Sequence, residues 1–171
     1  MTRGLKWREA DAGDKAVLQR FTCTEPPSRP GGRSRPLPYA RPYERVVQTY
    51  IRTGRGIGDP AGRMFLGDDD HGLAAVGSFW ILDEPGAYKL RVVAVALRAQ
   101  HNGYGRATLR YLVEQIGRHA LSTGCTDVDI FGSIHKDNSN SKRMCEAEGF
   151  ALLCPDGEEY DLYLRQVSFD A

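Results

Sequence analysis

The feature that most constrains the fold is the stretch from Lys89 to Ile116, where an apolar run is followed by a glycine turn and then by helical periodicity. The run from Leu90 to Leu97 is short, rich in valine and bounded by polar residues, which is typical of a strand buried on both faces. Apolar residues then recur at helical spacing: Leu109, Leu112, Val113, Ile116 and Ala120. The stretch therefore predicts a strand, a loop and a helix in succession.

The loop between this strand and helix, Gln100 to Ala107, contains Gly103 and Gly105. Because glycine lacks a Cβ, backbone N–H groups can converge there without obstruction. The first turn of the following helix adds unpaired N–H groups and the positive end of the macrodipole, which stabilise a phosphate or pyrophosphate. Glycine pairs also make ordinary strand-to-helix turns, and neither the Walker nor the Rossmann spacing is present. Both readings of the loop stay open on this pattern alone.

Two sequence blocks resemble those of a known family. Gln100-His-Asn-Gly103-Tyr-Gly105 resembles the Gln/Arg-x-x-Gly-x-Gly/Ala signature of the GNAT superfamily of acyl-CoA-dependent N-acyltransferases. Asn138 to Phe150 resembles its second block, an Asn-x-x-Ala/Ser helix that ends in Gly-Phe. The resemblance covers roughly residues 72 to 165, while the first seventy residues match only loosely. It implies an N-acetyltransferase that uses acetyl-CoA as co-substrate and a primary amine of a small molecule or peptide as acceptor.

The remaining patterns predict one GNAT-like domain over residues 1–171, because no linker, repeat or second core is visible. Its expected fold class is α/β, with a mixed, mostly antiparallel central sheet flanked by helices on both faces. Further strands are expected at 5–9, 64–67, 73–82, 127–131, 150–154 and 160–165. Further helices are expected at 15–23, 43–53 and 138–148, with a loop at 133–137. In the helix at 43–53, Val46, Val47, Tyr50 and Ile51 are expected to face inward.

Residues 26–63 form an unusual insertion, rich in arginine, proline and glycine. This segment holds eight arginines against two acids, Glu44 and Asp59, and six prolines lie between Pro26 and Pro42. It can be a solvated basic loop. By resemblance, the corresponding segment of the family covers the acceptor cleft, and its charge then favours an anionic acceptor.

Composition argues against several classes of protein. The net charge of +1 does not suggest a nucleic-acid partner, and the four cysteines show no metal-ligand spacing. The acidic turn Asp68-Asp-Asp-His71 is typical of a solvated turn, so no metal site is predicted. Neither a signal-peptide core nor a membrane-length apolar window is visible, so the expected location is cytoplasmic, without a membrane.

The resemblance also implies which residues bind acetyl-CoA. In the family the organising strand separates from its neighbour after the position matched by Val95, and free backbone groups there pair with pantetheine. The glycine loop takes the pyrophosphate, and Asn138 and Arg143 contact the pantetheine arm and the adenosine phosphate. The implied set is Val93, Ala94, Val95, Gln100, His101, Asn102, Gly103, Tyr104, Gly105, Arg106, Ala107, Asn138 and Arg143. Without a ligand, Val93 and Val95 would be ordinary core residues.

The candidate catalytic residues are Cys145 and Glu84. Many family members carry a tyrosine four residues before the Gly-Phe glycine, where it protonates the departing thiolate, and this chain has Cys145 there. A thiol can donate a proton, although a buried helix cysteine is the more ordinary interpretation of this position. Tyr160, Tyr163 or water are alternatives. Glu84 or Asp83, on the turn before the organising strand, or His135 could serve as base, although each also suits a surface position.

Two other functions stay open at this stage. The chain could acetylate a nucleic-acid-linked amine such as aminoacyl-tRNA, as toxin members of the family do, for which the arginine-rich insertion is the support. It could instead bind CoA without catalysis, which the missing tyrosine favours. The resemblance also allows a homodimer, and the sequence identifies neither the acceptor nor the oligomeric state.

Overall fold

The computed structural model describes residues 4–25 and 41–170. In this part of the chain seven strands form one sheet, ordered β1-β2-β3-β4-β5-β7-β6. The strands are β1 Lys6–Glu9, β2 Gly62–Asp69, β3 Gly72–Ile81, β4 Ala87–Val95, β5 Asp127–His135, β6 Ala151–Asp156 and β7 Tyr160–Ser168. The helices are η1 Ala12–Asp14, α1 Lys15–Leu18, α2 Pro42–Thr53, η2 Leu97–Ala99, α3 Tyr104–Ser122 and α4 Ser139–Ala147.

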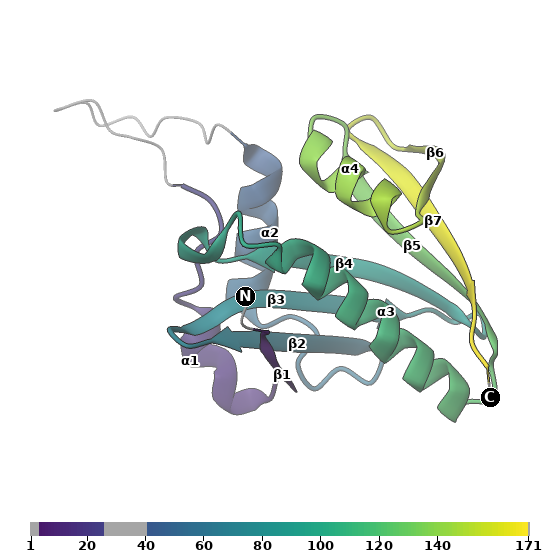
Figure 1. Cartoon of the computed structure of the whole chain (residues 1–171), viewed down its shortest axis with the longest axis horizontal. Helices are drawn as coiled ribbons and strands as arrows, with labels where there is room; N and C mark the ends of the chain where they lie inside the picture. The colour runs from purple at the N-terminus through teal and green to yellow at the C-terminus, as the bar shows by residue number, and fades with distance from the viewer. Residues whose placement is uncertain (1–3, 26–40, 171) are drawn as a thin grey trace, which may run out of the picture.

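The strand pairing confirms the predicted fold class. All neighbouring strands are antiparallel except β4 and β5, which run parallel. Helices α3 and α4 cover one face of the sheet, and α1 and α2 lie on the other (Figure 1). The protein has two hydrophobic cores, one on each face of the sheet, because successive side chains of a strand point to opposite faces. In β2, Met64 and Leu66 pack with α1 and α2, whereas Phe65 packs on the α3 side.

The Gly-Phe pair that closes the second sequence block has a clear structural reason. Gly149 follows α4 with φ +85°, a left-handed conformation that glycine adopts without a Cβ penalty. The Phe150 N–H then donates to the Cys145 carbonyl at 3.0 Å, and the Phe150 ring is buried in the core under α4. The pair therefore ends the helix and anchors it on the sheet.

The central feature of the sheet is the separation of β4 from β5. The two strands pair only from Ala87 to Leu90, and then diverge (Figure 1). The expectation that separation begins after Val95 was wrong by five residues. A register shift between β3 and β4 explains the early separation: Ser78 pairs with Val92 and Phe79 with Leu90, so Arg91 is an extra residue in β4. Such bulges bend a strand and commonly occur beside functional sites.

Three other expectations needed correction. Helix α1 ends at Leu18, because Phe21 and Cys23 turn into the core beyond it. Strand β5 continues to His135 instead of ending at 131, since β7 pairs with it along its whole length. On α2, Val46 is 60% exposed while Gln48 is buried. Within the described ranges, no helix combines the length and apolarity that crossing a membrane requires.

Candidate functional site

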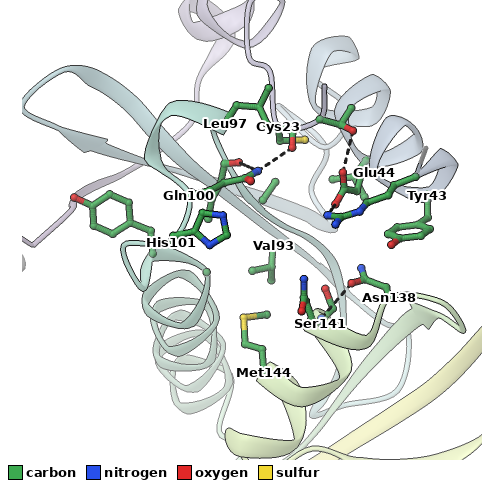
Figure 2. Close-up of a pocket in the computed structure, with 18 of the residues that line it drawn as sticks. Cys23, Tyr43, Glu44, Val93, Leu97, Gln100, His101, Asn138, Ser141 and Met144 are labelled. Carbon is green, nitrogen blue, oxygen red and sulfur yellow. Dashed lines mark hydrogen bonds and ion pairs between the residues drawn. The ribbon is translucent and has the colours of Figure 1, made fainter. Parts of the chain in front are cut away.

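A cleft of about 750 Å³ opens where β4 leaves β5. Its walls come from residues 23–25, the start of α2, the stretch from the end of β4 to the start of α3, and the first turns of α4 (Figure 2). Most of the predicted cofactor residues line it: Val93, Ala94, Val95, Gln100, His101, Gly103, Tyr104, Gly105 and Asn138. The structure therefore brings the two sequence blocks together around one cavity.

The end of β4 presents backbone hydrogen-bonding groups to this cleft. The Ala96 N–H donates to the Ala74 carbonyl of β3 at 2.8 Å. Because bonding alternates along an antiparallel pair, the N–H and C=O groups of Val95 and Val93 point away from β3, to the side where β5 no longer pairs. The Val95 carbonyl accepts a hydrogen bond from Gln100, and the Val95 N–H and the groups of Val93 can pair with the amide groups of an extended ligand.

The start of α3 provides an anion-binding cradle beside those groups. Gly103 precedes the helix with φ +76°, and the first intrahelical bond runs from the Ala107 N–H to the Gly103 carbonyl at 3.1 Å. The N–H groups of the preceding helical residues therefore point out of the helix end. A Cβ on Gly105 would stand 3.3 Å from the Met144 sulfur, so the space beside this backbone depends on glycine. The cradle thus offers N–H donors to an anionic group such as a phosphate.

The Gln100 side chain is engaged with the protein itself. Its Nε2 donates to the Cys23 carbonyl at 3.0 Å and to the Val95 carbonyl at 3.3 Å (Figure 2). Asn102 similarly uses its amide within the turn, where it donates to the Ala99 carbonyl at 3.1 Å. These side chains therefore shape the turn and join it to the 23–25 segment, while the turn backbone remains available to a ligand.

Several predicted residues lie outside the cleft wall. Asn102, Arg106, Ala107 and Arg143 are absent from its lining among the described residues. Arg106 instead pairs with the Glu148 carboxylate at 2.5 Å, and Arg110 donates to it at 2.8 Å. The hydrogen bond from Arg110 lowers the pKa of Glu148 below its usual value. This ion-pair network ties α3 to the end of α4.

The two candidate catalytic residues also lie away from the cleft. Cys145 is 7% exposed in the core cluster, and burial raises the pKa of its thiol to about 11. Glu84 lies in the turn between β3 and β4, at the opposite end of β4 from Val95, and Asp83 shares this turn. The geometry gives neither Cys145 nor Glu84 support as a proton donor or acceptor.

The other candidates for proton transfer differ in how close they lie to the cleft. Tyr163 is buried and donates to Glu146 at 3.3 Å. The His135 ring stacks on Tyr43 at 4.7 Å and meets the edge of Tyr160 at 5.2 Å. Tyr43 itself lines the cleft. His135 therefore contacts a residue that lines the cleft, and neither His135 nor Tyr160 is itself a lining residue.

The sequence indicated only that the segment 26–63 covers the acceptor cleft, and it singled out none of the residues that form the second wall: Thr24, Glu25, Arg41, Tyr43 and Glu44. These residues form no recognisable motif, and the sequence contained only one indication that α2 contacts the segment around residue 23. Gln48 is a polar residue in the apolar stripe of α2, and its buried oxygen accepts the Cys23 N–H at 2.9 Å. The predicted acceptor arginines, Arg29, Arg33 and Arg35, lie outside the described residues. In the described part of the chain, no three His, Cys, Asp or Glu side chains converge as a metal site.

Comparison with known proteins places these features in a family context. A family model described as the acetyltransferase (GNAT) family matches residues 26–150. Comparison with curated proteins gives no match. The solved structures that resemble this chain include the ribosomal-protein-S18-alanine N-acetyltransferase of Escherichia coli, with 12% identity, a TM-score of 0.65, and coverage of 98% of this chain and 96% of that one.

Two further solved structures extend the likeness. An acetyltransferase from Thermus thermophilus is 20% identical with a TM-score of 0.66, covering 97% of this chain and 99% of the other. The PaiA N-acetyltransferase from Thermoplasma acidophilum, solved in complex with coenzyme A, is 14% identical with a TM-score of 0.67, covering 96% and 99%. At these identities the likeness shows a shared fold over almost the whole of each chain.

Proposed function

Because the chain belongs to the GNAT acetyltransferase family, we propose that it transfers an acetyl group from acetyl-CoA directly to a primary amine of a small molecule or peptide. The observation that carries the proposal is the cleft beside β4, where the backbone groups of Val93 and Val95 lie next to the cradle at the start of α3. The E. coli neighbour is named as an N-acetyltransferase that acts on an alanine of a ribosomal protein, which supports an amine acceptor.

Acetyl-CoA supplies an acetyl group already activated as a thioester, so the protein's task is to hold and orient the reactants. The backbone of Val93 and Val95 holds the pantetheine arm in an extended form, and the α3 cradle holds the pyrophosphate. A backbone N–H beside the acetyl carbonyl stabilises charge that develops on its oxygen. Fixing the amine against this carbonyl supplies much of the remaining rate acceleration.

The state of Cys23 supports direct transfer over an acetylated enzyme. Cys23 lines the cleft, but burial, together with the charge of Glu44, raises the pKa of its thiol to about 12. At pH 7 the thiol therefore stays almost entirely in its protonated, weakly nucleophilic form. An amine held in the cleft is therefore the better nucleophile.

The test combines a binding measurement with a screen. Calorimetry is expected to show that acetyl-CoA binds with a stoichiometry of one, and a library of primary amines is expected to include acceptors that cause release of the CoA thiol. Mass spectrometry after incubation with acetyl-CoA alone is expected to find no acetyl-cysteine. Tight binding without thiol release on any amine would refute the transferase and leave a CoA-binding protein.

A further inference from the structure

The wall of the cleft formed by residues 23–25 and α2 holds a fixed carboxylate. Glu44 lies in the first turn of α2 and lines the cleft. Its carboxylate accepts a hydrogen bond from the Thr24 hydroxyl at 2.9 Å and another from the Arg41 guanidinium at 3.1 Å (Figure 2). The Glu44 side chain is 28% exposed, so it is partly shielded but still reached from the cleft.

The surroundings of Glu44 hold the carboxylate in place. Gln48, one turn further along α2, is buried and accepts the N–H groups of Cys23 at 2.9 Å and Thr24 at 3.4 Å. These bonds fasten α2 to the segment that carries Thr24. A carboxylate offers about four lone-pair positions, of which Thr24 and Arg41 use two. Glu44 can therefore accept further hydrogen bonds from N–H groups of a molecule in the cleft.

The opposite wall is the one that receives the acetyl donor. Val93, Asn138 and Ser141 lie around the same space as Glu44 (Figure 2), and Val95 lines the same cleft. An acceptor amine bound at Glu44 would therefore share one cleft with the β4 backbone. We propose that Glu44 holds the ammonium group of the acceptor and takes its proton, so that the acceptor is an alkylammonium cation; this inference rests on the proposed function.

The proposed step is a proton transfer from nitrogen to oxygen. One N–H bond of the ammonium breaks, an O–H bond forms on Glu44, and the nitrogen keeps the electron pair. That pair makes the new C–N bond as the C–S bond breaks. A second N–H proton ends on the CoA sulfur, and Glu44 releases its proton to solvent. Overall, one ammonium and one thioester give one amide, one thiol and one proton.

A base matters most for an acceptor of high pKa. An alkylamine with the lysine value of about 10.4 is neutral in only about one molecule in 2,500 at pH 7, whereas an α-amine near 8 is neutral in about one in ten. The dependence on Glu44 should therefore differ between these two kinds of amine. This difference separates a proton acceptor from a residue that merely maintains the fold.

The charge of the wall points to the same class of acceptor. Among the described lining residues of this wall, Glu25 and Glu44 contribute −2 and Arg41 contributes +1, a formal net charge of −1. Such a surface attracts an ammonium ion and opposes a phosphate at the reacting end. A nucleic-acid-linked amine is therefore disfavoured where the chemistry occurs, and a small or peptide-borne alkylammonium is favoured.

The first experiment compares Glu44→Gln with the wild type, using pentylamine and glycinamide as acceptors. We expect kcat/KM for pentylamine to fall by about 100-fold or more, the range of general-base catalysis, and the loss for glycinamide to be at least about tenfold smaller. The dissociation constant of acetyl-CoA should stay within about twofold. Glu114→Gln, an exposed substitution on α3, is the matched control. A Glu44→Gln enzyme within about threefold of wild type on pentylamine would overturn the proposal.

The second experiment measures binding without turnover. Calorimetric titration of 1,5-diaminopentane into the protein saturated with coenzyme A should show binding that weakens about tenfold or more in Glu44→Gln. Equal affinity in both proteins would overturn the ammonium site even if the enzyme acetylates amines. If diamine binding depends on Glu44 while no amine is acetylated, the transferase function fails and the cation site stands. Glu44→Asp keeps the negative charge and serves as a second variant. If the Asp and Gln variants lose the same diamine affinity and their Tm falls by the same amount, Glu44 has a structural role and the proposal is refuted.

Discussion

The cofactor cradle can be tested most directly at Gly105. Gly105 lies in the first turn of α3, where a Cβ would stand 3.3 Å from the Met144 sulfur and 3.9 Å from a Val95 methyl group. In Gly105→Val the two γ-methyl groups extend further into the space between α3, α4 and β4. The fold should tolerate the change, because valine is slightly better than glycine in a helix and Met144 has a flexible side chain.

The expected loss can be worked out from the hydrogen bonds that the cradle offers. A hydrogen bond to a charged partner contributes about 1.5–3 kcal/mol. If the valine side chain keeps a pyrophosphate from two N–H groups of the turn, binding weakens by at least about 3 kcal/mol. Since about 1.4 kcal/mol corresponds to a tenfold change in affinity, acetyl-CoA should bind about 100-fold more weakly. Gly103→Val tests the same cradle less cleanly, because φ at Gly103 is +76° and valine there strains the backbone.

Calorimetry with acetyl-CoA provides the measurement, and circular dichroism checks that the variant is folded. Glu114→Val places the same β-branched side chain on the exposed face of α3 and serves as the control. Its affinity for acetyl-CoA should equal that of the wild type. If folded Gly105→Val also binds acetyl-CoA as the wild type does, the pyrophosphate does not lie at this turn and the cofactor assignment is wrong.

Three other predictions address other parts of the chain. If the arginine-rich insertion binds an anionic tail of the acceptor, replacing Arg29, Arg33 and Arg35 together by serine should raise KM for 5-aminopentanoate but not for pentylamine. An unchanged KM for 5-aminopentanoate at low salt would contradict this role of the insertion. Cys145→Ala should leave kcat unchanged and lower the free energy of unfolding by about 1 kcal/mol, because Cys145 packs in the core; a hundredfold loss of kcat in the stable variant would make it the acid. Glu148→Gln should lower Tm at pH 7, because the hydrogen bond from Arg110 depresses the pKa of Glu148 in the folded protein. The resulting stabilisation is fully present above the pKa of Glu148 in the unfolded chain and disappears as the pH falls through its pKa in the folded protein. A Tm difference between variant and wild type that is the same at pH 7 and pH 3 would contradict this prediction.

The sequence was most informative where local chemistry determines structure. The periodicity from Leu109 to Ile116 predicted the buried face of α3, and the glycine before Phe150 predicted the end of α4. Errors arose where pairing partners decide the outcome. The small and polar residues after Phe131 resemble a loop, yet β5 continues to His135 because β7 offers a full-length partner. The extra residue at Arg91 depends on the register of β3, which no local pattern records.

The site divides in the same way. The half proposed to bind the cofactor is built from backbone, so the need for glycine at positions 103 and 105 leaves a pattern in the sequence. The half proposed to bind the acceptor is built from side chains of α2 and the 23–25 segment, which meet only after folding. Thr24 and Glu44 are twenty residues apart, and no fixed spacing connects them to β4. The sequence could therefore indicate the segment that covers the cleft, but not which of its side chains line the wall.

Gln100 shows how the two halves are joined. Sequence resemblance assigns its position to pyrophosphate binding, yet its amide nitrogen donates to the carbonyls of Val95 and Cys23, which is 77 residues away. A donor at this place ties the end of β4 to the acceptor wall, because both partners are backbone oxygens. Glutamine and arginine both carry side-chain N–H donors, whereas a glutamate would set a carboxylate against two carbonyl oxygens. In this chain Gln100 therefore bridges the strand proposed to hold the cofactor and the wall proposed to receive the amine.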